Sequence, residues 1–298
     1  MYKITLFNLL SLVFLIHISV HAQQDTVRNW KIKSLYTLNG TQNSFVNWNA
    51  GGRNNFSMIA SIGASALFTK RNLKWSNDIG IALGGIMYLD KKNGNTIQKT
   101  DDRLDLSSAC GVKFSNYYYT SINIGFRTQM ADGFNYPNDS LKVSTFMAPG
   151  YLNLALGIDY IKSDKFSVFA SLFAAKSTFV IDDSLASIGA FGVEKGSHYR
   201  QEYGAYFKMK YERTLAKNIE MKSKLELFSN YLNNPQNIDV NAELLLIFRV
   251  NSLFTASAQW NLIYDDDINI RDVNGGFGPR TQFKSVLGIG ISYKLNNK

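Results

Sequence analysis

Apolar and aromatic residues stand at every second position through about a dozen segments of this chain, each roughly ten to fifteen residues long. From 152 to 158, for example, every even position holds leucine or isoleucine, and Asn153, Ala155 and Gly157 stand between them. Successive side chains of a β-strand point to opposite faces, so such a segment forms a strand with one apolar face. Repeated segments of this kind are typical of β-barrels embedded in an outer membrane.

The alternation predicts an all-β fold, a transmembrane antiparallel up-and-down β-barrel of about 12 strands. The predicted strands are residues 33–43, 54–68, 73–88, 102–115, 117–130, 150–161, 165–175, 199–213, 218–231, 238–250, 252–264 and 282–295. An even number of strands brings both ends of the chain to one side of the membrane. The N- and C-termini are therefore expected to be periplasmic.

The links between these strands are alternately short and long. The short links are residues 70–72, 115–116, 162–164, 214–217 and 251. The other links are residues 47–53, 89–101, 131–149, 176–198, 232–237 and 265–281. Most of the second set are longer and rich in Gly, Asn and Asp, which suits exposed loops. The short links are predicted to be periplasmic turns and the long links extracellular loops.

Aromatic side chains gather at both ends of the predicted apolar face. Near the short links stand Phe68, Trp75, Phe114, Tyr118, Tyr160, Phe166, Tyr211 and Tyr293. Near the long links stand Tyr36, Phe56, Phe126, Tyr199, Tyr203, Tyr231, Trp260 and Tyr264. Amphipathic rings favour the headgroup level of a bilayer, so two aromatic girdles are expected.

The first 22 residues are predicted to be a cleaved signal peptide. Lys3 precedes an apolar run from Leu6 to Ile16, and small residues end at Ala22, a plausible cleavage point. A retained inner-membrane anchor is the alternative, although the run is short for a spanning helix. Residues 23–298 then form a single outer-membrane barrel domain, because the strand pattern is even and no linker composition divides it. The expected location is the cell outer membrane.

Charge favours some partners over others. Lys and Arg number 32 against 23 Asp and Glu, for a formal net charge of +9. The basic residues are scattered and form no stripe, so nucleic acid is not an expected partner. The expected partners are outer-membrane lipids, the barrel-assembly machinery during insertion and a small solute; a monomer is favoured.

The polar face of the strands supplies the candidate functional residues. The candidate lumen-lining residues are Arg103, Asp105, Asn123, Arg127, Asp159, Arg200, Glu202, Lys208, Lys222 and Glu226. Charges of both signs are costly in a dry core unless they are paired, so this face is expected to line a hydrated or salt-bridged lumen. These residues either brace a narrow barrel or line a permeation path. A soluble barrel with its aliphatic face inside is the rival fold, but alanines such as Ala60 and Ala64 are too small to fill so wide an interior.

No sequence motif assigns an enzymatic reaction, a cofactor or a metal site. Ser197 and His198 are a weak candidate for an outer-membrane lipid hydrolase, because adjacent strand residues point to opposite faces. The acidic groups at 101–102, 182–183 and 265–267 are either solvated loop acids or calcium ligands, and none has the spacing of a known calcium loop. The single cysteine, Cys110, falls on the apolar face and is expected to face lipid.

Several segments together resemble an uncharacterised family of outer-membrane β-barrels from Gram-negative bacteria. They are residues 47–57, 75–78, 99–106, 127–136, 146–160, 217–241 and 262–268. The resemblance runs from Trp30 to Leu295 and implies an outer-membrane location and a barrel fold, but no activity, because the family is a domain of unknown function. Relatives finish on an aromatic residue, whereas this chain has Leu295 there and Tyr293 two positions earlier.

Two functions from different classes are expected. The first is porin-like passage of a small solute through the lumen. The second is a structural or surface-interaction role for a barrel with an occluded lumen.

Overall fold

The computed structural model describes residues 29–45, 53–89, 94–136, 138–271 and 276–296, which leaves the predicted signal peptide outside the described residues. The barrel strands are β1 (Trp30–Asn43), β2 (Asn55–Lys70), β3 (Leu73–Tyr88), β4 (Thr96–Lys113), β5 (Tyr118–Thr128), β8 (Gly150–Ser163), β9 (Phe166–Phe179), β10 (Tyr199–Ala216), β11 (Ile219–Asn230), β12 (Asp239–Arg249), β13 (Phe254–Tyr264) and β16 (Gln282–Asn296). The other elements are β6 (Gly133–Phe134), β7 (Lys142–Ser144), α2 (Asp183–Ser187), the 3₁₀ helix η1 (Ala190–Gly192), β14 (Asn269–Arg271) and β15 (Phe277–Pro279).

The twelve long strands close into one barrel. Each pairs antiparallel with the barrel strands before and after it, and β1 closes the ring against β16 through pairs from Lys33 with Asn296 to Asn39 with Gly290. The predicted antiparallel up-and-down barrel of about 12 strands is therefore confirmed. Among the described residues, no helix is both long and apolar enough to cross a bilayer.

β4 and β9 extend furthest beyond their predicted spans. β4 begins at Thr96 rather than at 102, where polar residues carry no alternation, and β9 runs to Phe179 rather than ending at 175. In β9 the pairing register shifts opposite Gly157, and Leu172 and Phe173 are both exposed. Such a bulge reverses the side-chain alternation in the second half of the strand. Lys176 therefore lies in β9 and not in a loop.

The leucine row predicted to face lipid lies on the outside of the barrel. Leu154, Leu156 and Ile158 are each about half exposed, whereas Ala155 and Asp159 on the opposite face are buried. An apolar surface of this extent is stable in hydrocarbon and not in water. The rival fold, with its aliphatic face inside, is therefore wrong, because the described core contains the polar face.

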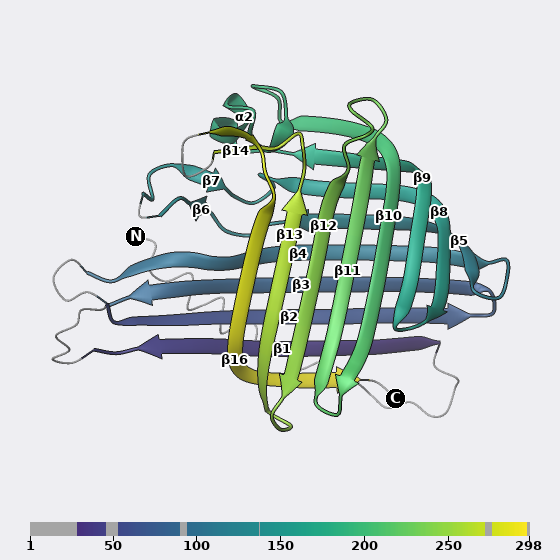
Figure 1. Ribbon diagram of the computed structural model, residues 1–298, viewed down its shortest axis with the longest axis horizontal. Helices are drawn as coiled ribbons and strands as arrows, with labels where there is room; N and C mark the ends of the chain where they lie inside the picture. Colours follow the sequence, from purple (N-terminus) through teal and green to yellow (C-terminus); the bar gives the residue numbers. More distant parts are fainter. Residues whose placement is uncertain (1–28, 46–52, 90–93, 137, 272–275, 297–298) are drawn as a thin grey trace.

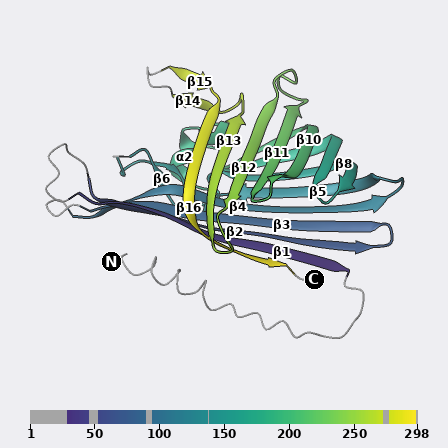
Figure 2. The same cartoon turned by 60° about the horizontal axis from the view of Figure 1, so that its bottom comes forward.

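The barrel is flattened, with two walls whose strands cross steeply. Strands β1 to β5 run across Figure 1, and β10 to β16 run over them at a large angle. Figure 2 shows the two walls one above the other. The short turns lie at the right and bottom of Figure 1, and α2, β6, β7 and β14 lie together at the upper left, at the long-loop end.

Aromatic rings form a belt around the short-turn end. Trp30 packs on Phe68 and on Trp75, with ring centroids 5.1 and 5.6 Å apart. On neighbouring strands the Tyr118 and Tyr160 rings are 5.2 Å apart, and further ring contacts lead through Phe166 to Tyr211. This belt lies where a headgroup layer is expected.

Candidate functional site: the barrel lumen

A belt of ion pairs crosses the middle of the lumen. The central ionic belt consists of Arg103, Asp105, Arg127, Glu226 and Glu243. Arg103 of β4 donates to Glu243 of β12 at 2.8 Å, and these two strands lie halfway around the ring from each other. Asp105 joins both arginines, at 3.0 Å from Arg103 and 2.7 Å from Arg127. Arg127 reaches Glu226 of β11 at 3.4 Å. The belt therefore ties the two walls together through the lumen.

The belt is paired but wet. The side chains of Arg103 and Arg127 keep 31% and 34% of their surface exposed, although both lie inside the barrel. Gly125, next to Arg127 on the same face of β5, has an open space where a side chain would stand, since no atom lies within 4 Å of an added Cβ. The centre of the lumen therefore has room for water.

A lysine-rich region lies between the belt and the short turns. Lys210 pairs with Asp78 across the lumen at 2.7 Å, and Lys224 pairs with Glu226 at 2.9 Å. Lys222 lines a hollow of about 150 Å³ beside them. Lys208 is buried two residues from Lys210 on the same face of β10, and within the described chain its ammonium group makes no hydrogen bond or ion pair. The nearby carboxylates therefore neutralise only part of the positive charge of these lysines.

A different cluster closes the lumen at the long-loop end. The loop-end cluster consists of Lys176, Arg200, Glu202, Asp239 and Asp265. The ammonium of Lys176 lies 2.5 Å from Asp239, 2.8 Å from Asp265 and 3.6 Å from Glu202. The Glu202 side chain is only 1% exposed, and that of Lys176 only 10%. Charges buried this deeply are held by their partners and not by water.

Apolar side chains fill the lumen between the belt and the loop-end cluster. Ala155, Phe169, Ala174, Tyr206 and Phe228 pack together and are buried. Tyr206 donates its hydroxyl to Glu226 at 2.8 Å, which joins this packing to the belt. The Lys176 ammonium lies 5.4 Å from the centre of the Phe228 ring, a cation–π contact that joins it to the cluster.

Arg200 fastens the long loops to the cluster. Its guanidinium binds Glu202 at 2.6 Å, Asp267 at 2.8 Å and the carbonyl oxygen of Gly192 at 2.9 Å. Gly192 has a φ of +79°, and a Cβ there would lie 2.3 Å from the Arg200 guanidinium, so only glycine fits this approach. Burial raises the pKa of Asp267, against the opposing charge of Arg200.

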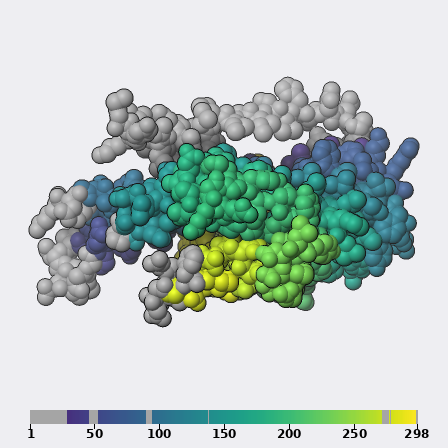
Figure 3. All heavy atoms as spheres, turned by 90° about the horizontal axis from the view of Figure 1, so that it is seen from above, coloured from purple at the N-terminus to yellow at the C-terminus, as the bar shows by residue number. Residues whose placement is uncertain are grey.

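The loops above the cluster form a small cap with its own core. Ala148, Val180, Leu185, Ala186 and Val193 are buried against one another. Asp182 caps α2 by accepting hydrogen bonds from the backbone N–H groups of Ser184 and Leu185. The hydrogen bond from Lys142, 2.5 Å away, is the main reason that the pKa of Asp182 falls to about 2. Seen from above, the green middle part of the chain lies beside the yellow last strands (Figure 3).

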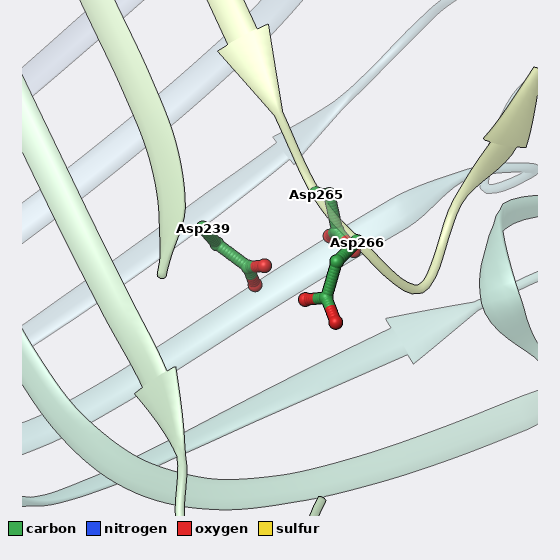
Figure 4. A group of neighbouring side chains, drawn as sticks. All are labelled: Asp239, Asp265 and Asp266. Atoms are coloured by element: carbon green, nitrogen blue, oxygen red, sulfur yellow. The ribbon is translucent and has the colours of Figure 1, made fainter. Parts of the chain in front are cut away.

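Part of one predicted acidic group gathers at the loop end. One carboxylate oxygen each of Asp239, Asp265 and Asp266 lies within 4.8 Å of the others, and Figure 4 shows these side chains between β12 and the end of β13. Calcium takes six to eight oxygen ligands. Here the Lys176 ammonium already contacts Asp239 and Asp265, and Asn237 donates to Asp266 at 2.6 Å. The protein therefore supplies its own cation to these acids.

The acidic group at 101–102 is also engaged within the barrel. Asp101 pairs with Lys284 of β16 at 2.5 Å. Asp102 accepts hydrogen bonds from the backbone N–H groups of Met130 and Ala131, both at 2.8 Å, and so holds the loop after β5.

Residues 41–134 match a family described as "Protein of unknown function (DUF3078)". This match covers about a third of the chain, a shorter stretch than the resemblance from Trp30 to Leu295 predicts. No curated protein matches the sequence significantly.

Three solved structures illustrate the structural similarity. The chain is 11% identical to an outer-membrane channel from Pseudomonas putida F1, with a TM-score of 0.38 over 92% of this chain and 100% of that one. It is 9% identical to the NanC porin, with a TM-score of 0.38 over 88% and 100% of the two chains. It is 8% identical to the translocator domain of the autotransporter NalP from Neisseria meningitidis, with a TM-score of 0.35 over 91% and 89%. The barrel fold of this chain rests on its own strand pairing.

The predicted lumen candidates divide between three regions. Arg103, Asp105, Arg127 and Glu226 meet in the central ionic belt, and Arg200 and Glu202 lie in the loop-end cluster. The lysine-rich region holds Lys208, which is in register with Glu226, and Lys222, which is nearer the short turns. Asn123 and Asp159 are buried side by side, 3.4 Å apart, on β5 and β8.

The hydrolase candidates are not brought together. Ser197 donates its hydroxyl to the carbonyl oxygen of Tyr199 at 2.8 Å, whereas His198 contacts the carbonyl oxygen of Val180 and the carboxylate of Asp183. No hydrogen bond joins the two side chains in the described part of the chain. Cys110 is exposed and pairs in register with the outward-facing Trp75.

Lys176 and the apolar packing around it were missed by sequence reasoning. The sequence pattern predicts that Lys176 begins a loop, because the bulge at Leu172 and Phe173 interrupts the alternation before it. Phe169, Tyr206 and Phe228 are apolar, so their residue types do not indicate that they face the lumen. Only their positions relative to charged residues such as Lys208 and Glu226 indicate it. That register was the available signal.

Proposed function

We propose that this chain is an outer-membrane β-barrel that passes small polar solutes slowly through its lumen. The observation that carries the proposal is the exposure of the central ionic belt, where paired arginines deep inside the barrel remain about one third accessible. A lumen that holds water around paired charges admits polar solutes, whereas an unfilled apolar cavity excludes them.

The proposed location is the outer membrane, with export directed by residues 1–22. The exposed leucines of β8 and the aromatic belt support a lipid environment around the barrel. The short turns are proposed to face the periplasm and the cap to face the outside.

The belt limits what passes. Arg103 and Glu243 meet from opposite walls, so their contact divides the lumen. A solute must therefore fit between bridged side chains, and both signs of charge along the way favour small ions or zwitterions over bulky or apolar molecules. The loop-end cluster and the cap close the far end in the described arrangement, which predicts rare openings and a low mean conductance.

Planar-bilayer recording of the purified mature barrel tests this proposal. Wild-type protein should give small, brief conductance steps. The double variant Arg127→Ala with Glu226→Ala removes one contact across the lumen, so its steps should be larger. Asp164→Asn is the matched control, because Asp164 forms its ion pairs with Lys31 and Lys74 at the short-turn rim. Equal steps in the double variant and the control would contradict passage through the belt.

The second candidate function is a closed barrel with a structural or surface-interaction role. The buried, ion-paired loop-end cluster favours it, because such a closure resists opening. If Lys176→Met, which removes the cation of the cluster, leaves the bilayer as silent as wild type, the closed barrel is the better account.

A lipid-hydrolase function is not proposed. The Ser197 hydroxyl and the His198 ring are each bonded to other groups, so among the described residues no base is hydrogen-bonded to the serine. We expect a phospholipase assay to give the same background for wild type and His198→Ala. Activity in wild type that is lost in His198→Ala would reverse this conclusion.

A further inference from the structure

A hollow of about 440 Å³ lies on the outer face of the wall formed by β1 to β5. Small side chains form one part of its floor beside Ile79, Leu106 and Ile124, and the outer strands contribute Ile32 of β1 and Phe126 of β5. These small residues are Ala64 and Ala66 of β2, Asn77 of β3 and Ser108 of β4. Ala66 is in register with Asn77, and Asn77 with Ser108, so the floor runs continuously from strand to strand. The hollow is therefore a groove across a surface that faces hydrocarbon.

Polar groups occupy the floor of this groove. The indole N–H of Trp75 donates to Ser108 Oγ at 2.9 Å, and Ser108 Oγ donates to Asn77 Oδ1 at 2.9 Å. This chain of hydrogen bonds ends on the Asn77 amide nitrogen, which has no acceptor within the described part of the protein. An N–H group facing hydrocarbon costs free energy unless an acceptor reaches it. The surroundings must supply that acceptor.

The depth of Asn77 indicates which acceptor this is. Asn77 lies two residues along β3 from Trp75, a distance of about 7 Å for a strand. Trp75 belongs to the aromatic belt, whose rings mark the headgroup level. The ester carbonyls of phospholipids lie just below that level, and each is attached to an acyl chain that suits an apolar groove.

Basic residues lie beyond the groove at the short-turn rim. Lys70 and Arg71 form the turn between β2 and β3, are exposed and have no ion-pair partner in the described chain. Lys70 is four residues from Ala66, about 13 Å along the strand, and long basic side chains extend toward the interface. A phosphodiester above the groove would therefore meet positive charge.

We propose that this groove binds one phospholipid of the leaflet at the short-turn end. An acyl chain lies over Ala64 and Ala66, an ester carbonyl accepts a hydrogen bond from the Asn77 amide, and Lys70 and Arg71 attract the phosphate. The site lies outside the barrel and does not depend on passage through the lumen.

Native mass spectrometry of the mature barrel in detergent micelles tests the site, with 1-palmitoyl-2-oleoyl-phosphatidylglycerol as the probe. Wild type should retain one lipid more tightly than any further lipids. Ala66→Phe fills the floor and should abolish this binding. Asn77→Leu removes one hydrogen bond and should weaken it about three- to tenfold. Ala256→Phe is the matched control, since Ala256 lies in register with the exposed Ile289 on the opposite wall, and it should bind as wild type does.

A diether analogue of the same lipid distinguishes the contribution of the hydrogen bond to binding from that of the acyl chain in the groove. It lacks the carbonyl acceptor, so wild type should bind it about as weakly as Asn77→Leu binds the ester lipid. Equal binding of ester and ether lipids by wild type would overturn the assigned contact. Unchanged lipid retention in Ala66→Phe, or a dimer of the barrel in place of the lipid adduct, would overturn the site itself.

Discussion

The central ionic belt and the loop-end cluster use the same chemistry in different surroundings. Both join Lys or Arg to carboxylates at distances near 3 Å. The arginines of the belt remain about one third exposed, whereas Glu202 of the cluster is almost completely buried. The attraction between two charges grows as the surrounding dielectric falls, and so does the cost of leaving one of them unpaired. Burial, and not distance, therefore separates a wet constriction from a closure.

The packing next to each region explains this difference. Gly125 leaves open space beside the belt, whereas Phe169, Tyr206 and Phe228 fill the lumen beside the cluster. Where bulky rings exclude water, the charges must satisfy one another.

The largest contrast is expected between removing Lys176 from the loop-end cluster and removing Lys210 from the lysine-rich region beside the belt. Lys176→Met leaves buried carboxylates without their cation and should lower the free energy of unfolding by about 3–5 kcal/mol. Lys210→Met removes the exposed pair with Asp78 and should cost less than about 1 kcal/mol. Urea unfolding in lipid vesicles measures both. Equal losses would show that the two regions do not differ in dielectric.

Two lumen-facing glycines sharpen the comparison of packing. A Cβ at Gly204, two residues from Glu202, would lie 1.8 Å from the carbonyl oxygen of Ser229. Gly204→Ala should therefore destabilise the barrel by about 1–3 kcal/mol, as overpacking does. Gly125→Ala meets open space and should change stability by less than about 0.5 kcal/mol. The same unfolding assay would refute the packing difference if Gly125→Ala were the costlier change.

The stability of the cap should fall in acid, because Asp182 becomes protonated. Its pKa of about 2 in the folded protein lies below the ordinary value of 3.8, so its contribution to stability is complete above pH 4 and is lost as the pH falls through about 2. Cleavage of residues 180–197 by pepsin should accelerate below pH 3 in wild type. Asp182→Ala loses the helix cap, worth about 1 kcal/mol, and should be cleaved faster already at pH 4. A wild-type rate that is flat from pH 4 to 2 would contradict this role.

The smallest effect is expected from divalent cations. Because the Lys176 ammonium contacts Asp239 and Asp265, calcium or EDTA should shift the Tm of wild type by less than about 1 °C. Lys176→Met removes that ammonium and should gain stability from calcium. A large calcium shift in wild type would show that the acids bind metal despite the lysine.

The sequence predicts the barrel well because alternation records which face each residue takes. The span 73–88 of β3 is predicted without error, since apolar residues continue to its end. The start of β4 is missed because Thr96 to Asp101 contain a single apolar residue, Ile97, and so show no alternation. Helix α2 is missed because a five-residue helix held by one capping aspartate leaves no periodic pattern.

The sequence predicts much less of the site. The pattern gives the face of Arg103 and Arg127 but not their partners, because the contact of Arg103 with Glu243 joins residues 140 positions apart. Which strands oppose one another depends on the closure and flattening of the barrel. The inward position of Lys176 is not predicted because of one bulge, since a single extra residue exchanges the two faces of a strand.

The most direct test of a wet centre and a dry loop end is thiol labelling of the folded barrel. In a Cys110→Ser background, Gly125→Cys places a thiol beside the belt and Ala174→Cys places one in the buried packing below the cluster. A charged, membrane-impermeant thiol reagent should label the first to completion and leave the second unlabelled until the barrel is unfolded. Equal labelling of the two in the folded state would contradict the account.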